Sequence, residues 1–192
     1  MGRKILVVLG HPDSESFCGA LFNAYIDGAK ESNSEIREIK IGELQFDPVL
    51  WKGYKVIQEL EPDLVESQKL IKWADHIVFV YPTWWGTIPS IMKGFIDRTF
   101  LPGFAFKFRD NSPFWDKLLA GRTAHLIVTM DTPSWYYRWI YHSPGHNEMK
   151  KTVLGFCGIK VNRISAFPMI KNSNQKKREN WLKIVKELGK QA

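Results

Sequence analysis

A loop that could bind an anion follows the first apolar run of the chain. Residues 10–19 supply the imidazole of His11, the hydroxyls of Ser14 and Ser16, and a predicted helix start near Phe17. The loop matches neither the glycine-rich dinucleotide fingerprint nor the P-loop with its Lys-Ser/Thr ending. Free amides at a helix start attract an anion and the helix dipole adds to this attraction, so a phosphate site is one interpretation. The alternative is that Ser14 or Ser16 only caps the helix.

A second candidate segment carries two adjacent indoles. Residues 81–89 read Tyr-Pro-Thr-Trp-Trp-Gly-Thr-Ile-Pro, with Trp84 and Trp85 close behind a predicted strand. Two neighbouring Trp side chains at a strand end cannot both point into one core. Their ring faces suit stacking on a flat aromatic ligand, and backbone groups of residues 83–86 could bind its polar edge. The alternative is ordinary packing between the sheet and the next helix.

The third candidate segment, residues 130–146, is dense in aromatic and imidazole side chains. They are Trp135, Tyr136, Tyr137, Trp139, Tyr141, His142 and His146. The rings could form a wall around a planar substrate, or a contact between two copies of the chain, where aromatic residues are enriched. His142 or His146 could protonate a reduced product, because an unperturbed imidazole titrates near neutral pH. A lone histidine is, however, more often structural.

Short apolar runs and amphipathic stretches alternate along the chain and would position these segments. Strands are predicted over residues 5–9, 36–41, 77–81, 123–129 and 161–167, and helices over residues 17–29, 63–73, 90–98, 147–156 and 175–188. Residues 42–61, 99–113 and 130–145 are predicted to be irregular. Parallel strands need helical crossovers, so the alternation predicts one α/β domain over residues 1–192: a doubly wound, five-stranded parallel sheet with helices on both faces. Ligands bind beyond the carboxyl ends of such strands, which selects the loops 10–16, 82–88 and 130–145.

Composition excludes several classes of protein. Of 192 residues, 44% are hydrophobic and 24% are charged, which excludes global disorder. Cys18 and Cys157 are too few for a disulfide framework or a four-ligand zinc site, and the histidines are scattered, so no metal site is predicted. No apolar run reaches the length of about 18 residues that a membrane-spanning helix needs. The amino-terminal residues do not resemble a signal peptide, so we expect a cytoplasmic protein without membrane insertion.

The formal net charge of +7 has two interpretations. It could indicate nucleic-acid binding, but the densest basic run, residues 176–178, lies in a predicted closing helix without any nucleic-acid-binding signature. We therefore expect no nucleic-acid partner. A positive field could instead attract a phosphorylated nicotinamide cofactor.

Several ordered sequence blocks resemble those of the flavodoxin-like NAD(P)H:quinone oxidoreductases, which include the ancillary reductases of potassium efflux systems. The resemblance extends from Lys4 to about Phe167. Its blocks are His11-Pro-x-Ser14-x-Ser16-Phe17, Pro82-Thr-Trp-Trp85-Gly86-x-x-Pro89, Lys93-Gly94-Phe95-x-Asp97-Arg98, Pro102-Gly103-Phe104-Ala105-Phe106, and Gly145-His146-Asn147-x-Met149-Lys150 through Phe156-Cys157-Gly158. Members bind FMN or FAD non-covalently, take a hydride from NAD(P)H onto the flavin, and pass two electrons to a quinone.

The resemblance implies roles for residues in all three loops. The flavin phosphate would be held by His11, Ser16, Phe17 and Cys18, and the flavin ring would be lined by Pro82, Thr83, Trp84, Trp85 and Gly86. Thr129 and Asp131 would close the other side, where relatives often carry Thr-x-Gly-Gly and this chain has no glycine. Relatives also place a Tyr and a His where charge on the reduced flavin is balanced. Tyr136 or Tyr137 could match this Tyr, and we predict Tyr136 with His146 as the catalytic pair.

The function implied is a two-electron, ping-pong NAD(P)H:quinone oxidoreductase that forms a homodimer and takes a quinone or another small electron acceptor. Two alternatives belong to other classes: a flavin-binding electron carrier, and an accessory regulatory subunit of a transport system. FMN is favoured over FAD because only one helix follows the fifth strand. We expect the Trp residues to divide between the pocket walls and the core. The walls would contain Trp84, Trp85, Trp115, Trp135 and Trp139, and the core Trp51, Trp73 and Trp181.

Overall fold

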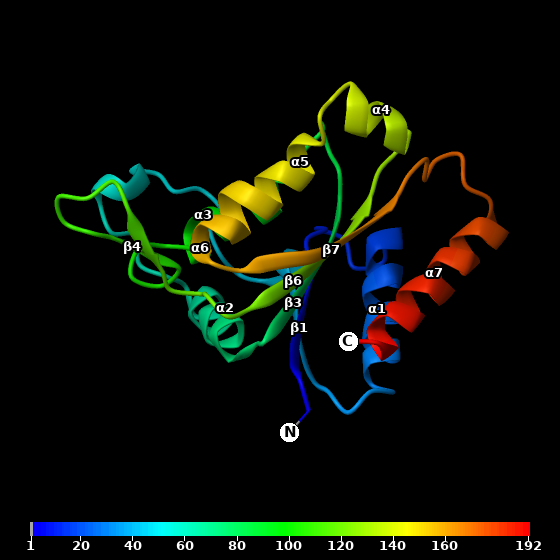
Figure 1. The fold of residues 1–192 in the computed structure, drawn as a ribbon, viewed down its shortest axis with the longest axis horizontal. Coiled ribbons are helices and arrows are strands. Elements are labelled where there is room, and N and C mark those ends of the chain that lie inside the picture. The colour runs from blue at the N-terminus through cyan, green and yellow to red at the C-terminus, as the bar shows by residue number, and fades with distance from the viewer. Residues whose placement is uncertain (1) are drawn as a thin grey trace.

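The computed structural model describes residues 2–192 and contains a five-stranded parallel sheet (Figure 1). The strands lie in the order β2-β1-β3-β6-β7. They are β1 (Lys4–Leu9), β2 (Glu35–Lys40), β3 (His76–Pro82), β6 (Thr123–Thr129) and β7 (Lys160–Phe167), and every neighbouring pair is parallel. The three central strands β1, β3 and β6 are apolar and almost wholly buried, because helices cover both faces. The predicted α/β fold class is confirmed.

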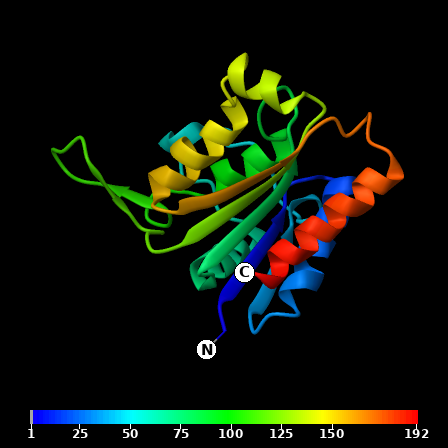
Figure 2. The same cartoon turned by 45° about the vertical axis from the view of Figure 1, so that its right-hand side comes forward.

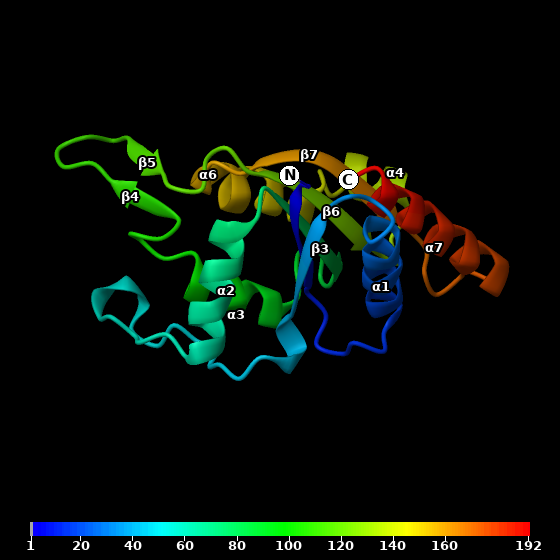
Figure 3. The same ribbon diagram turned by 90° about the horizontal axis from the view of Figure 1, so that it is seen from below.

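Helices form a layer on each face of the sheet, as Figures 1 and 3 show. One layer consists of α1 (Phe17–Ala29) and α7 (Gln175–Lys190). The other consists of α2 (Pro62–Trp73), α3 (Ser90–Thr99) and a continuous helical segment made of α5 (Pro144–Asn147), the π-helix η3 (Glu148–Leu154) and α6 (Gly155–Cys157). α1 and α7 approach closely at Gly28, where a Cβ would lie only 1.9 Å from the carbonyl oxygen of Lys186. No helix within residues 2–192 is long and apolar enough to cross a membrane.

The chain between α3 and β6 differs from the predicted long loop. It contains an antiparallel hairpin, β4 (Phe106–Phe108) and β5 (Trp115–Lys117), which lies outside the main sheet. Strands of three residues are too short to show a periodic pattern, so the sequence does not reveal them. Trp115 stacks on Phe156 with ring centroids 4.4 Å apart, and its indole nitrogen donates to the carbonyl oxygen of Phe156 at 2.8 Å. Trp115 therefore supports the hairpin and, contrary to the prediction, lines neither of the two cavities described below.

The segment between β2 and α2 is irregular, as predicted, apart from the short 3₁₀ helices η1 (Ile41–Glu43) and η2 (Gly53–Lys55). The fully buried Arg98 of α3 anchors this segment. Its guanidinium donates to the carbonyl oxygens of Asp47 and Glu59, and its Nη2 lies 2.9 Å from Glu61 Oε2. A buried guanidinium is tolerated because carbonyl and carboxylate oxygens surround it.

The predicted loop 130–145 contains a further short helix, α4 (Ser134–Trp139), whose end projects beyond one edge of the sheet in Figures 1 and 2. Trp139 on this helix is exposed, and it lines neither of the two cavities described below. Trp181 is buried, as predicted for a packing residue, whereas Trp51 is exposed and that prediction is wrong.

Candidate functional site

A cleft of about 280 Å³ lies where the carboxyl ends of β1, β3 and β6 meet at one edge of the sheet. Its walls come from the loops after β1, β3, β6 and β7. The lining residues are His11, Ser16, Phe17, Cys18, Pro82, Thr83, Trp84, Thr129, Met130, Asp131, Ile170 and Lys171. All the predicted cofactor-binding residues except Trp85 and Gly86 line this cleft. The sheet thus brings together segments that are far apart in the sequence.

The loop after β1 presents hydrogen-bond donors at the start of α1, an arrangement suited to binding an anion. Ser16 is the N-cap residue, and its Oγ accepts a hydrogen bond from the amide of Gly19 at 3.2 Å. The amides of Phe17 and Cys18 lie in the first turn of α1, where an amide has no carbonyl acceptor within the helix, so they are free to bind a ligand. His11 Nδ1 accepts a hydrogen bond from the amide of Asp13 at 2.9 Å, which leaves the proton of a neutral ring on Nε2. Ser16 therefore caps the helix and lines the cleft at once.

The loop after β3 sends its two indoles in different directions. Trp84 lines the cleft and its ring lies 5.4 Å from the ring of His11, edge to face. Trp84 and Thr87 exchange two backbone hydrogen bonds of 3.0 Å, and the two residues between them, Trp85 and Gly86, both have positive φ. This is the pattern of a tight two-residue turn. Trp85 at its tip is completely exposed and lies outside the cleft.

The loop after β6 closes the cleft together with a loop that the sequence analysis missed. The Cys18 Sγ and Thr129 Oγ1 atoms lie 3.1 Å apart, which joins α1 to β6. Asp131 accepts a hydrogen bond from the amide of Lys171 at 2.9 Å, and its other oxygen lies 3.6 Å from Lys171 Nζ. This contact brings the loop after β7 into the site, with Ile170 beside it. The rule that ligands bind at carboxyl strand ends would have found this loop had it been applied to the fifth strand.

Of the two tyrosines considered for the predicted catalytic pair, it is Tyr137 and not Tyr136 whose ring lies against that of His146. The rings of Tyr137 and His146 lie 5.0 Å apart, whereas Tyr136 packs against Trp135 and Tyr141. Burial raises the pKa of Tyr137 and lowers that of His146. His146 Nε2 is buried without a hydrogen-bond partner among residues 2–192. Neither Tyr137 nor His146 lines the cleft itself.

Tyr137 instead connects α4 to the turn that carries Trp85. Its hydroxyl donates to the carbonyl oxygen of Gly86 at 2.8 Å and accepts from the amide of Gly145 at 2.9 Å. A Cβ on Gly145 would lie 3.0 Å from this hydroxyl oxygen, so the close approach favours glycine there. The turn, α4 and the start of α5 are therefore held as one unit beside the cleft.

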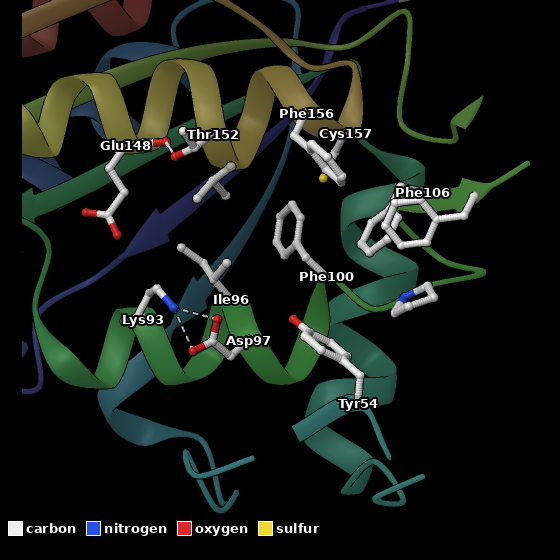
Figure 4. A pocket seen from close by; sticks show the side chains of 13 residues that line it. Tyr54, Lys93, Ile96, Asp97, Phe100, Phe106, Glu148, Thr152, Phe156 and Cys157 are labelled. Atoms are coloured by element: carbon white, nitrogen blue, oxygen red, sulfur yellow. Dashed lines mark hydrogen bonds and ion pairs between the residues drawn. The ribbon is translucent and has the colours of Figure 1, made fainter. Parts of the chain in front are cut away.

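A larger cavity of about 640 Å³ lies between α3, the β4-β5 hairpin and the helical segment 148–157 (Figure 4). Phe100, Phe106 and Phe156 make its wall largely apolar. Lys93, at one end, donates to both carboxylate oxygens of Asp97 at 2.7 and 2.8 Å. None of the residues predicted for the site lines this cavity. The smaller cleft is the better candidate site, because it combines an anion cradle with an aromatic wall.

The residues of the strand-end cleft fit a flavin mononucleotide moiety. A phosphate would accept hydrogen bonds from the amides of Phe17 and Cys18 and from His11 Nε2, where the dipole of α1 favours negative charge. A flat ring would lie against Trp84, with Thr83 and Asp131 at its polar edge. Burial raises the pKa of Cys18 to about 12, so its side chain is a neutral thiol that packs in the wall.

Comparison with known proteins agrees with the observed fold. A family model described as a flavodoxin-like fold matches residues 3–189. A ribosyldihydronicotinamide dehydrogenase [quinone] of Pongo abelii is 28% identical over 208 residues, covering 92% of this chain and 87% of that protein. The NAD(P)H dehydrogenase [quinone] 1 of Rattus norvegicus is 27% identical, and the match covers 83% of this chain and 66% of that protein. The crystal structure of Smu.1420 from Streptococcus mutans UA159 superimposes with a TM-score of 0.80 at 26% identity, covering 98% of this chain and 100% of that one. Because the family model spans nearly all of the sequence, the chain belongs to the family of proteins with a flavodoxin-like fold.

Proposed function

We propose that the chain is a flavin-dependent NAD(P)H:quinone oxidoreductase that binds FMN in the strand-end cleft. The observation that carries the proposal is the pairing of an anion cradle at the start of α1 with the indole of Trp84 in one cleft. The similarity to enzymes named as quinone dehydrogenases supports the reaction class. A bound flavin would supply the hydride chemistry, accepting a hydride from NAD(P)H and passing two electrons to a quinone. The protein's own part is to bind and orient the reactants.

Different residues of the cleft would bind the two parts of the flavin, its phosphate and its ring. His11 Nε2 and the amides of Phe17 and Cys18 would hold one phosphate, which is the anion that FMN carries. Trp84 would orient the ring and exclude water from one side of it. Tyr137 would hold the backbone of the turn at residues 84–87 against the ring through its hydrogen bond to the Gly86 carbonyl oxygen, and the ring of His146 lies against that of Tyr137.

A direct assay tests the reductase function. The full chain, purified and supplied with FMN, is expected to oxidise NADH or NADPH only when a quinone is present. Analysis of the flavin released on denaturation would identify FMN or FAD. If neither nicotinamide is oxidised with any quinone, the reductase proposal is refuted. Flavin bound but not bleached by either nicotinamide would support the electron-carrier alternative instead.

We also propose that the chain forms a homodimer through the face that carries the larger cavity. Large apolar side chains are exposed there on η2, the residues beside it and the β4-β5 hairpin: Trp51, Tyr54, Ile57, Phe108 and Phe114. Tyr54 and Phe108 also line the cavity, so the exposed surface continues into it. Exposed apolar surface of this extent is rare on monomers. Light scattering is expected to give twice the mass of 22.3 kDa. A monomeric mass would contradict the dimer proposal and would leave the proposal of a flavin site unaffected.

A further inference from the structure

The cavity between α3, the β4-β5 hairpin and the helical segment 148–157 has the form of a small-molecule site (Figure 4). Its volume of about 640 Å³ lies within the range of about 300–1,000 Å³ that such sites occupy. Small-molecule sites combine apolar walls with a few polar groups that fix the orientation of the ligand. The cavity shares no lining residue with the strand-end cleft, so the proposed reductase function does not use it.

Aromatic side chains form much of the cavity wall. Phe100 directly follows α3, Phe106 and Phe108 come from the hairpin, and Phe156 comes from α6. The ring of Phe106 packs edge to face against both Phe156, at 4.9 Å between ring centroids, and Phe108, at 5.2 Å. Rings fixed in this way offer an apolar surface to the body of a ligand.

One end of the cavity is polar and carries an unpaired carboxylate. Lys93 donates to both carboxylate oxygens of Asp97, so the charges of these two side chains balance each other. Glu148 makes no ion pair among residues 2–192, and its Oε2 has no hydrogen-bond partner there. Figure 4 shows the side chains of Glu148 and Lys93 on the same side of the cavity, away from Phe106.

The other lining residues do not balance the charge of Glu148. Burial raises the pKa of Cys157 to about 11, so its side chain is a neutral thiol near neutral pH. Lys117 and Lys150, on β5 and η3, do not line the cavity, and Lys117 lies over the ring of Trp115 at 5.9 Å from its centre. The cavity therefore presents one negative charge in excess, although the whole chain is positive.

Glu148 belongs to a rare type of helix. Residues 148–154 form the π-helix η3, and Thr152 and Val153 of this helix line the cavity as well. The hydroxyl of Thr152 donates to the carbonyl oxygen of Glu148 at 2.8 Å, which ties the two residues together. π-Helices are uncommon and are found frequently at functional sites, which agrees with a ligand site at this wall.

We propose that the cavity binds a small amphipathic amine, with its apolar body against the phenylalanine rings and its ammonium group at Glu148. A protonated amine supplies the positive charge that this carboxylate lacks, together with hydrogen-bond donors for it. The ammonium group would lie between α3 and η3, which carry the polar residues of the cavity. This proposal does not rest on the reductase function.

Calorimetric titration of the full chain at pH 8, without flavin or nicotinamide, tests the proposal. The probes are three naphthalene compounds: naphthylethylamine, which is a cation at this pH, naphthylethanol, which is neutral, and naphthylacetate, which is an anion. The amine is expected to bind about tenfold more tightly than the alcohol, because it forms a charge-assisted hydrogen bond with the carboxylate. The acetate should bind more weakly than the alcohol, because like charges repel.

Glu148→Gln keeps the size of the side chain and removes its charge. It should weaken binding of the amine about tenfold and change the affinity for the alcohol by less than about twofold. Asp131→Asn is the matched control: it removes a carboxylate from the strand-end cleft, so binding of the amine should be unchanged.

No binding of the amine by wild type, as when a partner chain fills the cavity, would overturn the proposal. Equal amine affinities of wild type and Glu148→Gln would overturn it as well. So would an equal loss in Asp131→Asn and Glu148→Gln, because the amine would then not distinguish the cavity from the strand-end cleft. Reductase activity does not enter the measurement, so failure of the enzyme proposal would leave its result intact.

Discussion

The two indoles after β3 show how much depends on the direction of a single side chain. Trp84 lines the cleft and contacts His11, whereas Trp85 faces solvent. Trp84→Ala is expected to weaken FMN binding about tenfold through loss of ring contact, and Trp85→Ala to leave it unchanged. Quenching of flavin fluorescence during titration measures both. Equal affinities for wild type and Trp84→Ala would refute the stacking role.

Burial also decides the chemistry of the two cysteines. It raises the pKa of Cys18 to about 12 and that of Cys157 to about 11. The thiolate is the reactive form, so at pH 8 both side chains should resist iodoacetamide in the folded protein and react rapidly in denaturant. Mass spectrometry of the alkylated chain gives the extent of reaction. Rapid labelling of Cys18 without denaturant would show that α1 does not seal it against β6.

At the scale of elements, one hydroxyl joins α4 to the turn after β3. Tyr137→Phe removes it and leaves the carbonyl of Gly86 and the amide of Gly145 with one contact fewer. We expect the free energy of unfolding to fall by about 0.5–1.5 kcal/mol, the net contribution of a typical hydrogen bond, because the Gly145 amide still donates to the Gly86 carbonyl oxygen at 3.1 Å. Urea denaturation measures this change.

Tyr136→Phe is the matched control for that experiment. Tyr136 is the next residue on the same helix and packs against Trp135 and Tyr141, away from the turn. Its loss of a hydroxyl should change stability by no more than about 0.5 kcal/mol, as for an ordinary surface substitution. Equal effects of the two substitutions would mean that the Tyr137 hydroxyl does not hold the turn.

At the scale of the whole molecule, two histidines within the sheet predict how stability depends on pH. Burial, with help from nearby positive charge, lowers the pKa of His76 to about 3 and that of His125 to about 4, from an ordinary value of 6.5. Below pH 6.5 these two histidines therefore bind protons in the unfolded chain, whereas in the folded chain they stay neutral down to their lowered pKa values. The contribution of each histidine to stability is full above this pH and falls by up to about 1.4 kcal/mol per pH unit, down to about pH 4 for His125 and about pH 3 for His76.

Urea denaturation between pH 7.5 and 4.5 measures this slope. His125→Gln keeps a hydrogen-bonding group for Ser165, whose Oγ lies 3.0 Å from His125 Nε2, but it cannot titrate. The variant should therefore lose less stability than wild type as the pH falls. Parallel curves for the two proteins would show that His125 is protonated as easily in the folded state as in the unfolded one.

Most of the site could be predicted because sheet topology follows from local pattern. Three apolar strands with helices between them must form a parallel sheet, and their carboxyl ends must then lie at one edge. Thus His11, Trp84 and Thr129 could be assigned to one site before any contact was known. The loop at residues 168–171 follows the fifth predicted strand and lies at the same edge, but its residue types carry no ligand-binding signal, and its contact with the loop after β6 is formed by the Lys171 amide and Asp131.

The sequence by itself determined the α/β class, the loops that bear the site, and the types of residue available there. Only the tertiary structure decided between neighbours: Trp84 over Trp85 for the cleft, and Tyr137 over Tyr136 for contact with His146. Strand and helix periodicity arises from local backbone geometry, which each stretch of sequence carries within itself. The direction of a side chain on a turn or a short helix is set by bonds to distant residues, such as that from Tyr137 to Gly86, and those form only when the chain has folded.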